Sequence, residues 1–382
     1  MLKRFSKLKY FVPLLTFTLI TGCVNKSKDK AVFNAVKVNT LTEVTGADEK
    51  IPKYNHIFVI IAENKAYSQM IGNGKNTPNL TNLANTYGLA TNFYGEVHPS
   101  EANYIAILGG STFGIHDDDA YYCQAGSSDR FCHNSKKADY ANHTIDSRSL
   151  MDQLEENKLT WKGYFEDIPT PGSSSVVYPD AKRALYASKH NGFMNFKKLQ
   201  NDPDITNKIV GLNQLATDLQ SNKAPNYSHI ILNQCDEMHG LAECPNMNNL
   251  IAVGDKQIGN IVSQIQNSKL WKSKENNAIV ITWDEDDNPI VKTETQGCCG
   301  TDSKSKANFG GGHIATIVIT NHGVRHVVDA TPYNHYSLLR TTEDAFGIHE
   351  YLNYAGDTEH GVKPMTSLFA TSENQISFQT TK

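Results

Sequence analysis

The chain has 382 residues, of which 39% are hydrophobic, 9% are aromatic and 20% are charged. This length and composition predict a sizeable buried core, in one large α/β domain or in two domains of ordinary size. The formal net charge is −4, so the protein has no excess of positive charge to attract phosphate backbones. This argues against nucleic acid as a partner.

The chain begins with the pattern of an export signal. Basic residues precede an apolar run over residues 10–20, and this run is too short to span a bilayer as a helix. Thr21 and Gly22 then lead into Cys23, a segment that resembles the bacterial lipobox, in which the cysteine is acylated and becomes the first residue of the mature protein. An ordinary cleaved signal with an incidental cysteine is the alternative.

This pattern sets the expected domain organisation and location. We expect a signal peptide over 1–22, a polar tether with acylated Cys23 over 23–51, a folded domain over 52–370 and a flexible tail over 371–382. The protein is then anchored by lipid in the bacterial cell envelope, or exported. Val24 rather than an aspartate follows Cys23, which in a Gram-negative host indicates the outer membrane.

Six further cysteines, an even number in a chain predicted to be exported, indicate disulfides. The pairs Cys123–Cys132 and Cys235–Cys244 can each close a short loop, whereas the adjacent Cys298 and Cys299 cannot be assigned a partner from the sequence. A structural zinc site is the alternative, but no CxxC pair supports it.

Four apolar runs predict buried strands, at residues 56–62, 228–232, 278–283 and 314–320. Helical patterns lie between and after them, at residues 77–88, 98–110, 147–157, 246–266 and 336–346. Strands that alternate with helices predict an α/β fold with a central, mostly parallel sheet sandwiched by helices.

Three of the predicted strands lead into acidic residues. Glu63 and Asn64 follow the first, Asp236 and His239 follow the second, Asp284 and Glu285 follow the third, and His313 precedes the fourth. The carboxyl ends of parallel strands meet at one edge of a sheet, and clustered carboxylates raise one another's pKa unless a cation neutralises them. The sequence therefore predicts a divalent metal site, whose ligands fit zinc, manganese or iron, and magnesium where imidazole contributes little.

Ser100 starts the predicted helix over 98–110 and has two interpretations. Serine is a favoured N-cap for structural reasons, and by itself the pattern favours this role. Beside the predicted metal, however, its hydroxyl is a competent nucleophile at a helix end that attracts anions. Asn103, one turn later, is then placed to bind a phosphoryl oxygen.

Eight short motifs occur in an order that matches one family. They are AEN (62–64), TPNL (77–80), HPSEANY (98–104), WKGYFEDIP (161–169), YASKHNGF (186–193), DEMHG (236–240), WDEDD (283–287) and YNHYSLLRTTEDAFGI (333–348). Together they resemble the phosphoesterase family of bacterial and fungal acid phosphatases and phospholipases C, within the alkaline phosphatase superfamily. The resemblance implies an alkaline-phosphatase-like fold and hydrolysis of phosphate esters through a covalent phosphoserine.

The resemblance also implies roles for individual residues. It implies that Ser100 is the nucleophile and that Asn103 binds the phosphate group. It also implies that the metal ligands are Ser100, Glu63, Asn64, Asp284 and Glu285. Asp236, His239 and His313 fall where the superfamily keeps a second metal, or where a one-metal member binds phosphate and protonates the leaving group. His239, His190 and His98 are the candidates for that proton donor.

The expected function is therefore a metal-dependent hydrolase of phosphate esters, of the acid phosphatase type. A phospholipase C that cleaves a lipid phosphodiester is the first alternative. A tethered solute-binding lipoprotein is the alternative outside the enzymes. A sulfatase is disfavoured because the chain has no CxPxR segment.

Overall fold

The structure is a computed structural model that describes residues 50–245, 247–287, 296–300 and 310–371. The predicted signal peptide, Cys23 and nearly all of the predicted tether lie outside the described residues, as does the predicted C-terminal tail except for Thr371. Within the described ranges, no helix is long and apolar enough to cross a membrane.

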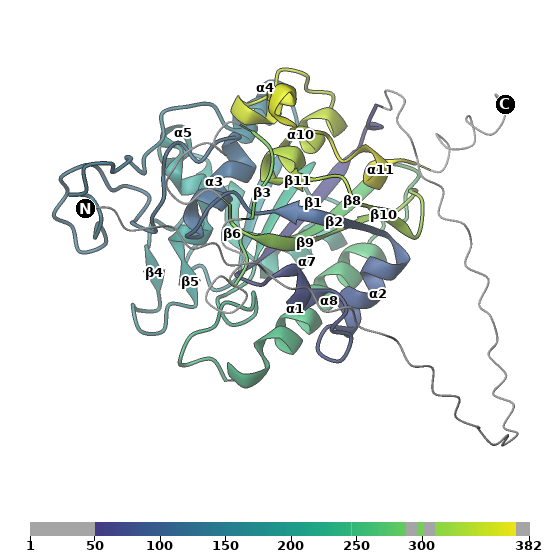
Figure 1. Ribbon diagram of the computed structural model, residues 1–382, viewed down its shortest axis with the longest axis horizontal. Coiled ribbons are helices and arrows are strands. Elements are labelled where there is room, and N and C mark those ends of the chain that lie inside the picture. The colour runs from purple at the N-terminus through teal and green to yellow at the C-terminus, as the bar shows by residue number, and fades with distance from the viewer. Residues whose placement is uncertain (1–49, 246, 288–295, 301–309, 372–382) are drawn as a thin grey trace, which may run out of the picture. The chain divides into compact units, whose positions relative to one another are not determined.

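A nine-stranded sheet forms the centre of the part of the chain that the structure describes (Figure 1). The strands follow the order β10-β2-β9-β8-β1-β7-β3-β6, and β11 pairs with β2. Every pairing is parallel except those of β9 with β2 and with β8. The predicted mostly parallel sheet is confirmed. The bounds are β1 His56–Ala62, β2 Gly88–Tyr94, β3 Trp161–Phe165, β6 Ile209–Gly211, β7 Tyr227–Ile231, β8 Asn277–Trp283, β9 His313–Thr320, β10 Val327–Asp329 and β11 Tyr333–Asn334.

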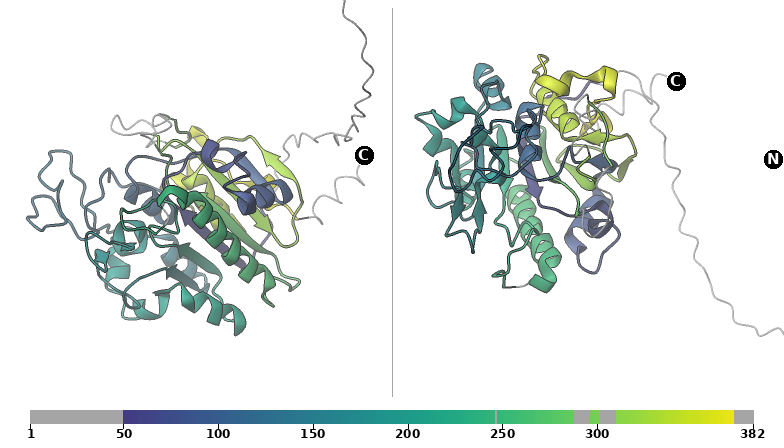
Figure 2. Two further views of the ribbon diagram at one scale, coloured as in Figure 1. Left: turned by 90° about the horizontal axis from the view of Figure 1, so that it is seen from below. Right: turned by 60° about the vertical axis from the view of Figure 1, so that its left-hand side comes forward.

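Helices cover both faces of this sheet, as predicted. On one face α3 packs against α10, and on the other α2 packs against α8 (Figure 1 and Figure 2). The helices are α1 Tyr67–Met70, α2 Pro78–Thr86, α3 Glu101–Gly109, α4 Leu150–Glu156, α5 Lys197–Gln200, α6 Ile205–Lys208, α7 Asn213–Gln220, α8 Leu250–Asn267, α10 His335–Ala345 and α11 Thr366–Phe369. A separate two-stranded sheet pairs β4 (Val177–Tyr178) with β5 (Tyr186–Ala187).

The two strands at the middle of the sheet explain why the site forms where it does. All of β8, and all of β1 after His56, is buried, which suits apolar and β-branched residues covered on both faces. The parallel register pairs Ala62 with Trp283. Glu63 and Asp284 therefore leave the sheet side by side, at its carboxyl edge.

The sequence pattern missed strands β2 and β3 and the short strands β6, β10 and β11, and it did not give the direction of β9. The sequences of β2 and β3, GLATNFY and WKGYF, are interrupted by glycine and polar residues, so neither shows a continuous apolar run. Because β9 runs antiparallel to β8, its first residue, His313, lies at the same edge as the ends of β1 and β8.

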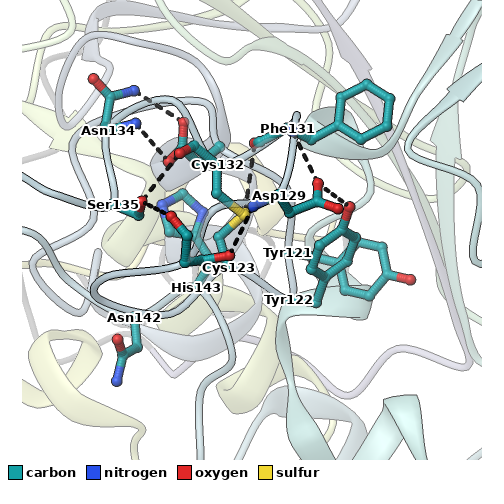
Figure 3. Close-up of a disulfide and its surroundings, with 12 residues drawn as sticks. Tyr121, Tyr122, Cys123, Asp129, Phe131, Cys132, Asn134, Ser135, Asn142 and His143 are labelled. Carbon is teal, nitrogen blue, oxygen red and sulfur yellow. Dashed lines mark hydrogen bonds between the residues drawn. A yellow bond between two sulfur atoms is a disulfide. The ribbon is translucent and has the colours of Figure 1, made fainter.

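Disulfides link the cysteine pairs that the loop lengths suggested. Cys123 is bonded to Cys132 (Figure 3) and Cys235 to Cys244. The adjacent Cys298 and Cys299 are bonded to each other, which settles the pairing that the sequence left open.

Candidate functional site

Three buried carboxylates gather at the carboxyl edge of the sheet. Glu63 follows β1, and Asp284 and Glu285 follow β8; one carboxylate oxygen of each lies within 4.8 Å of the others. Asn64 continues from Glu63, and its backbone N–H donates to Asp284 Oδ1 at 2.9 Å. This hydrogen bond fastens the ends of the two strands together, so the carboxylates are held in place by the sheet.

The electrostatics of this group favour a bound cation. Burial, together with the charges of Glu63 and Glu285, raises the pKa of Asp284 well above its usual range. Burial also raises the pKa of Glu285 to about 7, although His98 opposes the shift. Asp284 Oδ2 and Asn64 Oδ1 are buried atoms without a hydrogen-bond partner among the described residues. Oxygen atoms crowded in this way fit a divalent metal ion.

Ser100 lies directly before α3, and its hydroxyl faces the carboxylates. Its Oγ is 2.5 Å from Glu63 Oε1 and 3.0 Å from Glu285 Oε1, and the residue is 2% exposed. The side chain makes no capping hydrogen bond, so the N-cap interpretation of this hydroxyl is wrong. A hydroxyl has one proton and cannot donate to both carboxylates at once, and a cation between these oxygens would remove that conflict.

Asn103 supports the segment that leads into Ser100. Its Oδ1 accepts from the backbone N–H groups of Glu96 at 2.8 Å and Val97 at 3.2 Å, and its Nδ2 donates to the carbonyl of Val97 at 2.8 Å. These contacts are with the backbone and not with the carboxylate group. The contact of Asn103 with a phosphoryl oxygen stays a prediction.

A second buried group lies beside the first and shares Glu63. His190 places Nδ1 3.0 Å from Glu237 Oε1 and Nε2 3.3 Å from Glu63 Oε2. Tyr104 donates to the same Glu63 oxygen at 2.7 Å, and its ring stacks on that of His190. Ligand atoms of Glu63, His190 and Glu237 also lie within 4.8 Å of one another.

The charges of this second group stabilise the protonated imidazole. Burial lowers the pKa of His190, but the carboxylates of Glu237 and Glu63 outweigh burial and raise it to about 10. The imidazole in turn holds the pKa of Glu63 well below its usual range, in spite of the burial that opposes this shift. The two carboxylates that flank the ring therefore favour the protonated form of His190.

The acid that joins the site after β7 is Glu237, which the sequence pattern missed. The structure does not bring Asp236, the predicted residue, into either group: its Oδ2 accepts instead from Gln257 Nε2 on α8, at 3.0 Å. The turn that follows β7 places its residues irregularly, with Met238 at φ +84°. Two adjacent acids in such a turn cannot be told apart by sequence.

The other predicted histidines lie in three different settings. His98 Nδ1 contacts Glu285 Oε2, and its Nε2 lies 3.6 Å from Asp286 Oδ1. The ring of His239 lies 6.1 Å from that of His190, and its Nδ1 is 2.9 Å from the carbonyl oxygen of Gly240. His313 is outside both groups, because its ring stacks on Tyr67 and its Nε2 is 2.8 Å from the Thr91 carbonyl oxygen.

Two lysines pair with acids beside the site. Lys189 Nζ lies 3.0 Å from Asp118 Oδ2, and Lys65 Nζ lies 3.6 Å from Asp287 Oδ2. Burial opposes the charge of Lys189, but Asp118, Glu63 and Asp284 raise its pKa. Neither lysine was singled out from the sequence as a site residue.

Comparison with known proteins identifies the family. The family model of the Phosphoesterase family matches residues 73–349. The chain belongs to the Phosphoesterase family. The predicted family is thereby confirmed, and with it the expectation of a phosphoric ester hydrolase, whereas a solute-binding lipoprotein is set aside.

Curated relatives of this phosphoesterase are similar over most of the chain. A phosphatidylinositol-3-phosphatase of Mycobacterium tuberculosis is 25% identical over 311 residues, which cover 81% of this chain and 83% of that protein. An acid phosphatase of Aspergillus fumigatus is 25% identical over 300 residues, which cover 77% of this chain and 55% of the fungal protein. The chain thus spans about half the length of the fungal relative.

Two solved structures were compared with this phosphoesterase, and the first of them shares its fold. A protein of glycosaminoglycan metabolism from Bacteroides thetaiotaomicron has a TM-score of 0.51 at 12% identity, covering 83% of this chain and 81% of that one. A protein in the alkaline phosphatase superfamily from Vibrio parahaemolyticus has a TM-score of 0.47 at 13% identity, covering 78% and 69%.

Proposed function

We propose that this phosphoesterase is a metal-dependent phosphomonoesterase that acts through a covalent phosphoserine on Ser100. The observation that carries the proposal is the position of the Ser100 hydroxyl, within 3.0 Å of two of the three buried carboxylates. The named relatives, a phosphatidylinositol-3-phosphatase and an acid phosphatase, support a monoester as substrate.

The residues that would hold the metal are Glu63, Asn64, Asp284 and Glu285, with Ser100 beside them. A divalent cation bound there supplies positive charge that makes the serine hydroxyl easier to deprotonate and offsets the negative charge of the phosphate oxygens. Zinc, magnesium and manganese all accept such oxygen ligands.

Ser100 Oγ then forms a bond to phosphorus while the bond from phosphorus to the ester oxygen breaks, which yields a phosphoserine and an alcohol. Water next attacks the phosphoserine, the bond from Oγ to phosphorus breaks, and inorganic phosphate leaves. In the first step the proton that Ser100 loses is balanced by the proton that the leaving alcohol gains. In the second step water supplies its hydroxyl to phosphorus and a proton to Ser100 Oγ, so Ser100 ends the cycle unchanged.

His239 is the candidate that best fits protonation of the leaving alcohol. His98 and His190 each direct both ring nitrogens at carboxylates, so neither can turn to a substrate without losing an ion pair. His239 instead places Nδ1 against the Gly240 carbonyl. A carbonyl oxygen only accepts hydrogen bonds, so Nδ1 carries the proton there and Nε2 is the nitrogen that exchanges one.

The test replaces the nucleophile and traps the intermediate. With p-nitrophenyl phosphate, Ser100→Ala should lower kcat at least about a thousandfold while Tm stays close to that of the unmodified protein. Acid quenching during turnover should leave the mass of one phosphoryl group on the peptide that contains Ser100. Ser149→Ala, a change of a buried serine at the start of α4, is the matched control and should keep its activity.

Two results would contradict the proposal. Retained turnover in Ser100→Ala, or a trapped phosphoryl group on another residue, would remove Ser100 from the nucleophile role. Release of phosphocholine from phosphatidylcholine, without turnover of p-nitrophenyl phosphate, would instead indicate a phospholipase C.

A further inference from the structure

The helix that follows the proposed nucleophile begins without a cap from its own serine. The first N–H groups of a helix have no acceptor within the helix, and a serine at this position ordinarily supplies one from an extended backbone. Ser100 has helical angles, φ −52° and ψ −49°, and its side chain makes no capping hydrogen bond. Its hydroxyl is engaged with Glu63 and Glu285 instead.

A carboxylate from elsewhere in the chain takes the place of that cap. Asp118, 17 residues after Glu101, accepts from the Glu101 backbone N–H through Oδ1 at 3.1 Å. We infer that Asp118 is a positioning residue that caps α3 in place of Ser100 and so keeps the serine hydroxyl directed at the carboxylates. This inference rests on the proposed role of Ser100 as nucleophile.

Contacts of the neighbouring residues fix the loop that carries Asp118 against the start of α3. Asp117 Oδ1 lies 3.1 Å from His143 Nε2, and His143 Nδ1 lies 3.1 Å from Glu101 Oε2. His143 and Glu101 are both fully buried. The residue that follows Ser100 is therefore held from outside its helix by Asp118 at its N–H, and by His143 and Asn195 at its carboxylate, where Asn195 Nδ2 donates to Oε1 at 2.6 Å.

Contacts on the far side of the loop fix it further. Asp119 accepts from the backbone N–H of Asn134 at 2.9 Å and from its Nδ2 at 3.0 Å. The His143 N–H donates to the Cys123 carbonyl at 3.0 Å, next to the Cys123–Cys132 disulfide (Figure 3). The three consecutive aspartates, 117 to 119, thus contact different parts of the structure, and the middle one reaches the start of α3.

Asp118 has a second contact, and the test must separate it from capping. Its Oδ2 pairs with Lys189 Nζ at 3.0 Å, so loss of the carboxylate also leaves that lysine without this ion pair. Asparagine keeps an oxygen acceptor for the Glu101 N–H but has no charge for Lys189. Asp118→Asn should therefore preserve the cap and remove the ion pair.

The experiment compares Asp118→Ala with Asp118→Asn in the full chain, using p-nitrophenyl phosphate. Asp118→Ala should lower kcat by about tenfold to a hundredfold, because a small displacement of a nucleophile has an effect of this size. Its KM, and the inhibition constant of inorganic phosphate, should change by less than about threefold, because Asp118 is inferred to orient the hydroxyl and not to bind substrate. Asp118→Asn should recover kcat to within about threefold of the unmodified protein.

Asp152 offers a matched control, because its carboxylate also accepts a hydrogen bond from a backbone N–H at the beginning of a helix and also pairs with a lysine. It accepts from the Ser149 N–H at 2.7 Å at the beginning of α4 and pairs with Lys198. Asp152→Ala should lower Tm about as much as Asp118→Ala but leave kcat unchanged. A loss of kcat in both variants would mean that destabilisation alone is responsible, and the inference would be wrong.

Two further results would overturn the inference. Unchanged kcat in Asp118→Ala would do so, and so would an Asp118→Asn variant as slow as Asp118→Ala, which would assign the effect to charge. If Asp118→Ala does not fold, the rates of phosphoenzyme formation are compared between Asp118→Asn and Asp118→Ser. A faster rate in Asp118→Asn supports capping by the side chain at this position, and equal rates in the two variants oppose it. An active Ser100→Ala variant would instead reject the proposed function.

Discussion

Glu343 is one of the buried carboxyl groups that make the stability of this protein depend on pH. The side chain lies in α10, is fully buried, and accepts from the Leu352 N–H at 2.9 Å. Burial raises its pKa to about 8, whereas a glutamate in an unfolded chain titrates near about 4.3. The folded state thus binds this proton more tightly, so the stabilisation is complete below about pH 4 and is lost as the pH rises to about 8.

Glu343→Gln should remove this part of the pH dependence, because glutamine keeps an acceptor for Leu352 and does not titrate. Between pH 5 and pH 8, Tm of the variant should fall less than Tm of the unmodified protein, by a few degrees. Differential scanning calorimetry at several pH values measures the difference. Glu350→Gln, at an exposed glutamate, is the control, and identical pH profiles for Glu343→Gln and the unmodified protein would contradict the prediction.

At the scale of the element, α3 depends on a glycine at its end as well as on Asp118 at its start. Gly110 has φ +70°, and its N–H donates to the Ala106 carbonyl to close the helix. A Cβ at this position would lie 2.3 Å from the Leu352 carbonyl oxygen. Both the backbone conformation and the close approach therefore require glycine here.

Gly110→Ala should destabilise the protein by about 2–3 kcal/mol, because the left-handed conformation and the collision with backbone both cost free energy. Chemical denaturation measures this change. Gly126→Ala is the control, since Gly126 also has a positive φ, +80°, but has nothing within 4 Å of the added Cβ. If the two variants lose equal stability, the contact with Leu352 has no energetic consequence and the account of this helix end is wrong.

At the scale of the whole molecule, the site exists because strands distant in sequence end at one edge of the sheet. The β1–β8 register pairs Ala62 with Trp283 and so brings Glu63 beside Asp284, more than two hundred residues away in the chain. Their continuous apolar runs made both strands, and the acids after them, predictable. Ser100 was predictable as a helix start, and the family resemblance led to the nucleophile role that is proposed for it.

Other parts of the site depend on contacts that local sequence does not encode. Nothing in the run IATIVIT distinguishes an antiparallel β9 from a parallel one, and the direction of that strand is what places His313 at the edge. The choice of Glu237 over Asp236 is made by an irregular turn. The cap that Asp118 supplies to α3 comes from a loop whose path is set by tertiary contacts.

Buried carboxylates from distant strands are proposed to hold one divalent cation beside Ser100. Elemental analysis of the purified protein measures this ion, with the Glu63→Ala/Asp284→Ala double variant analysed in parallel. We expect about one divalent ion per chain in the unmodified protein, loss of that ion in the double variant, and loss of turnover when a chelator removes it. Full turnover of p-nitrophenyl phosphate by protein that contains no stoichiometric divalent ion would show that the reaction does not depend on a metal at this site.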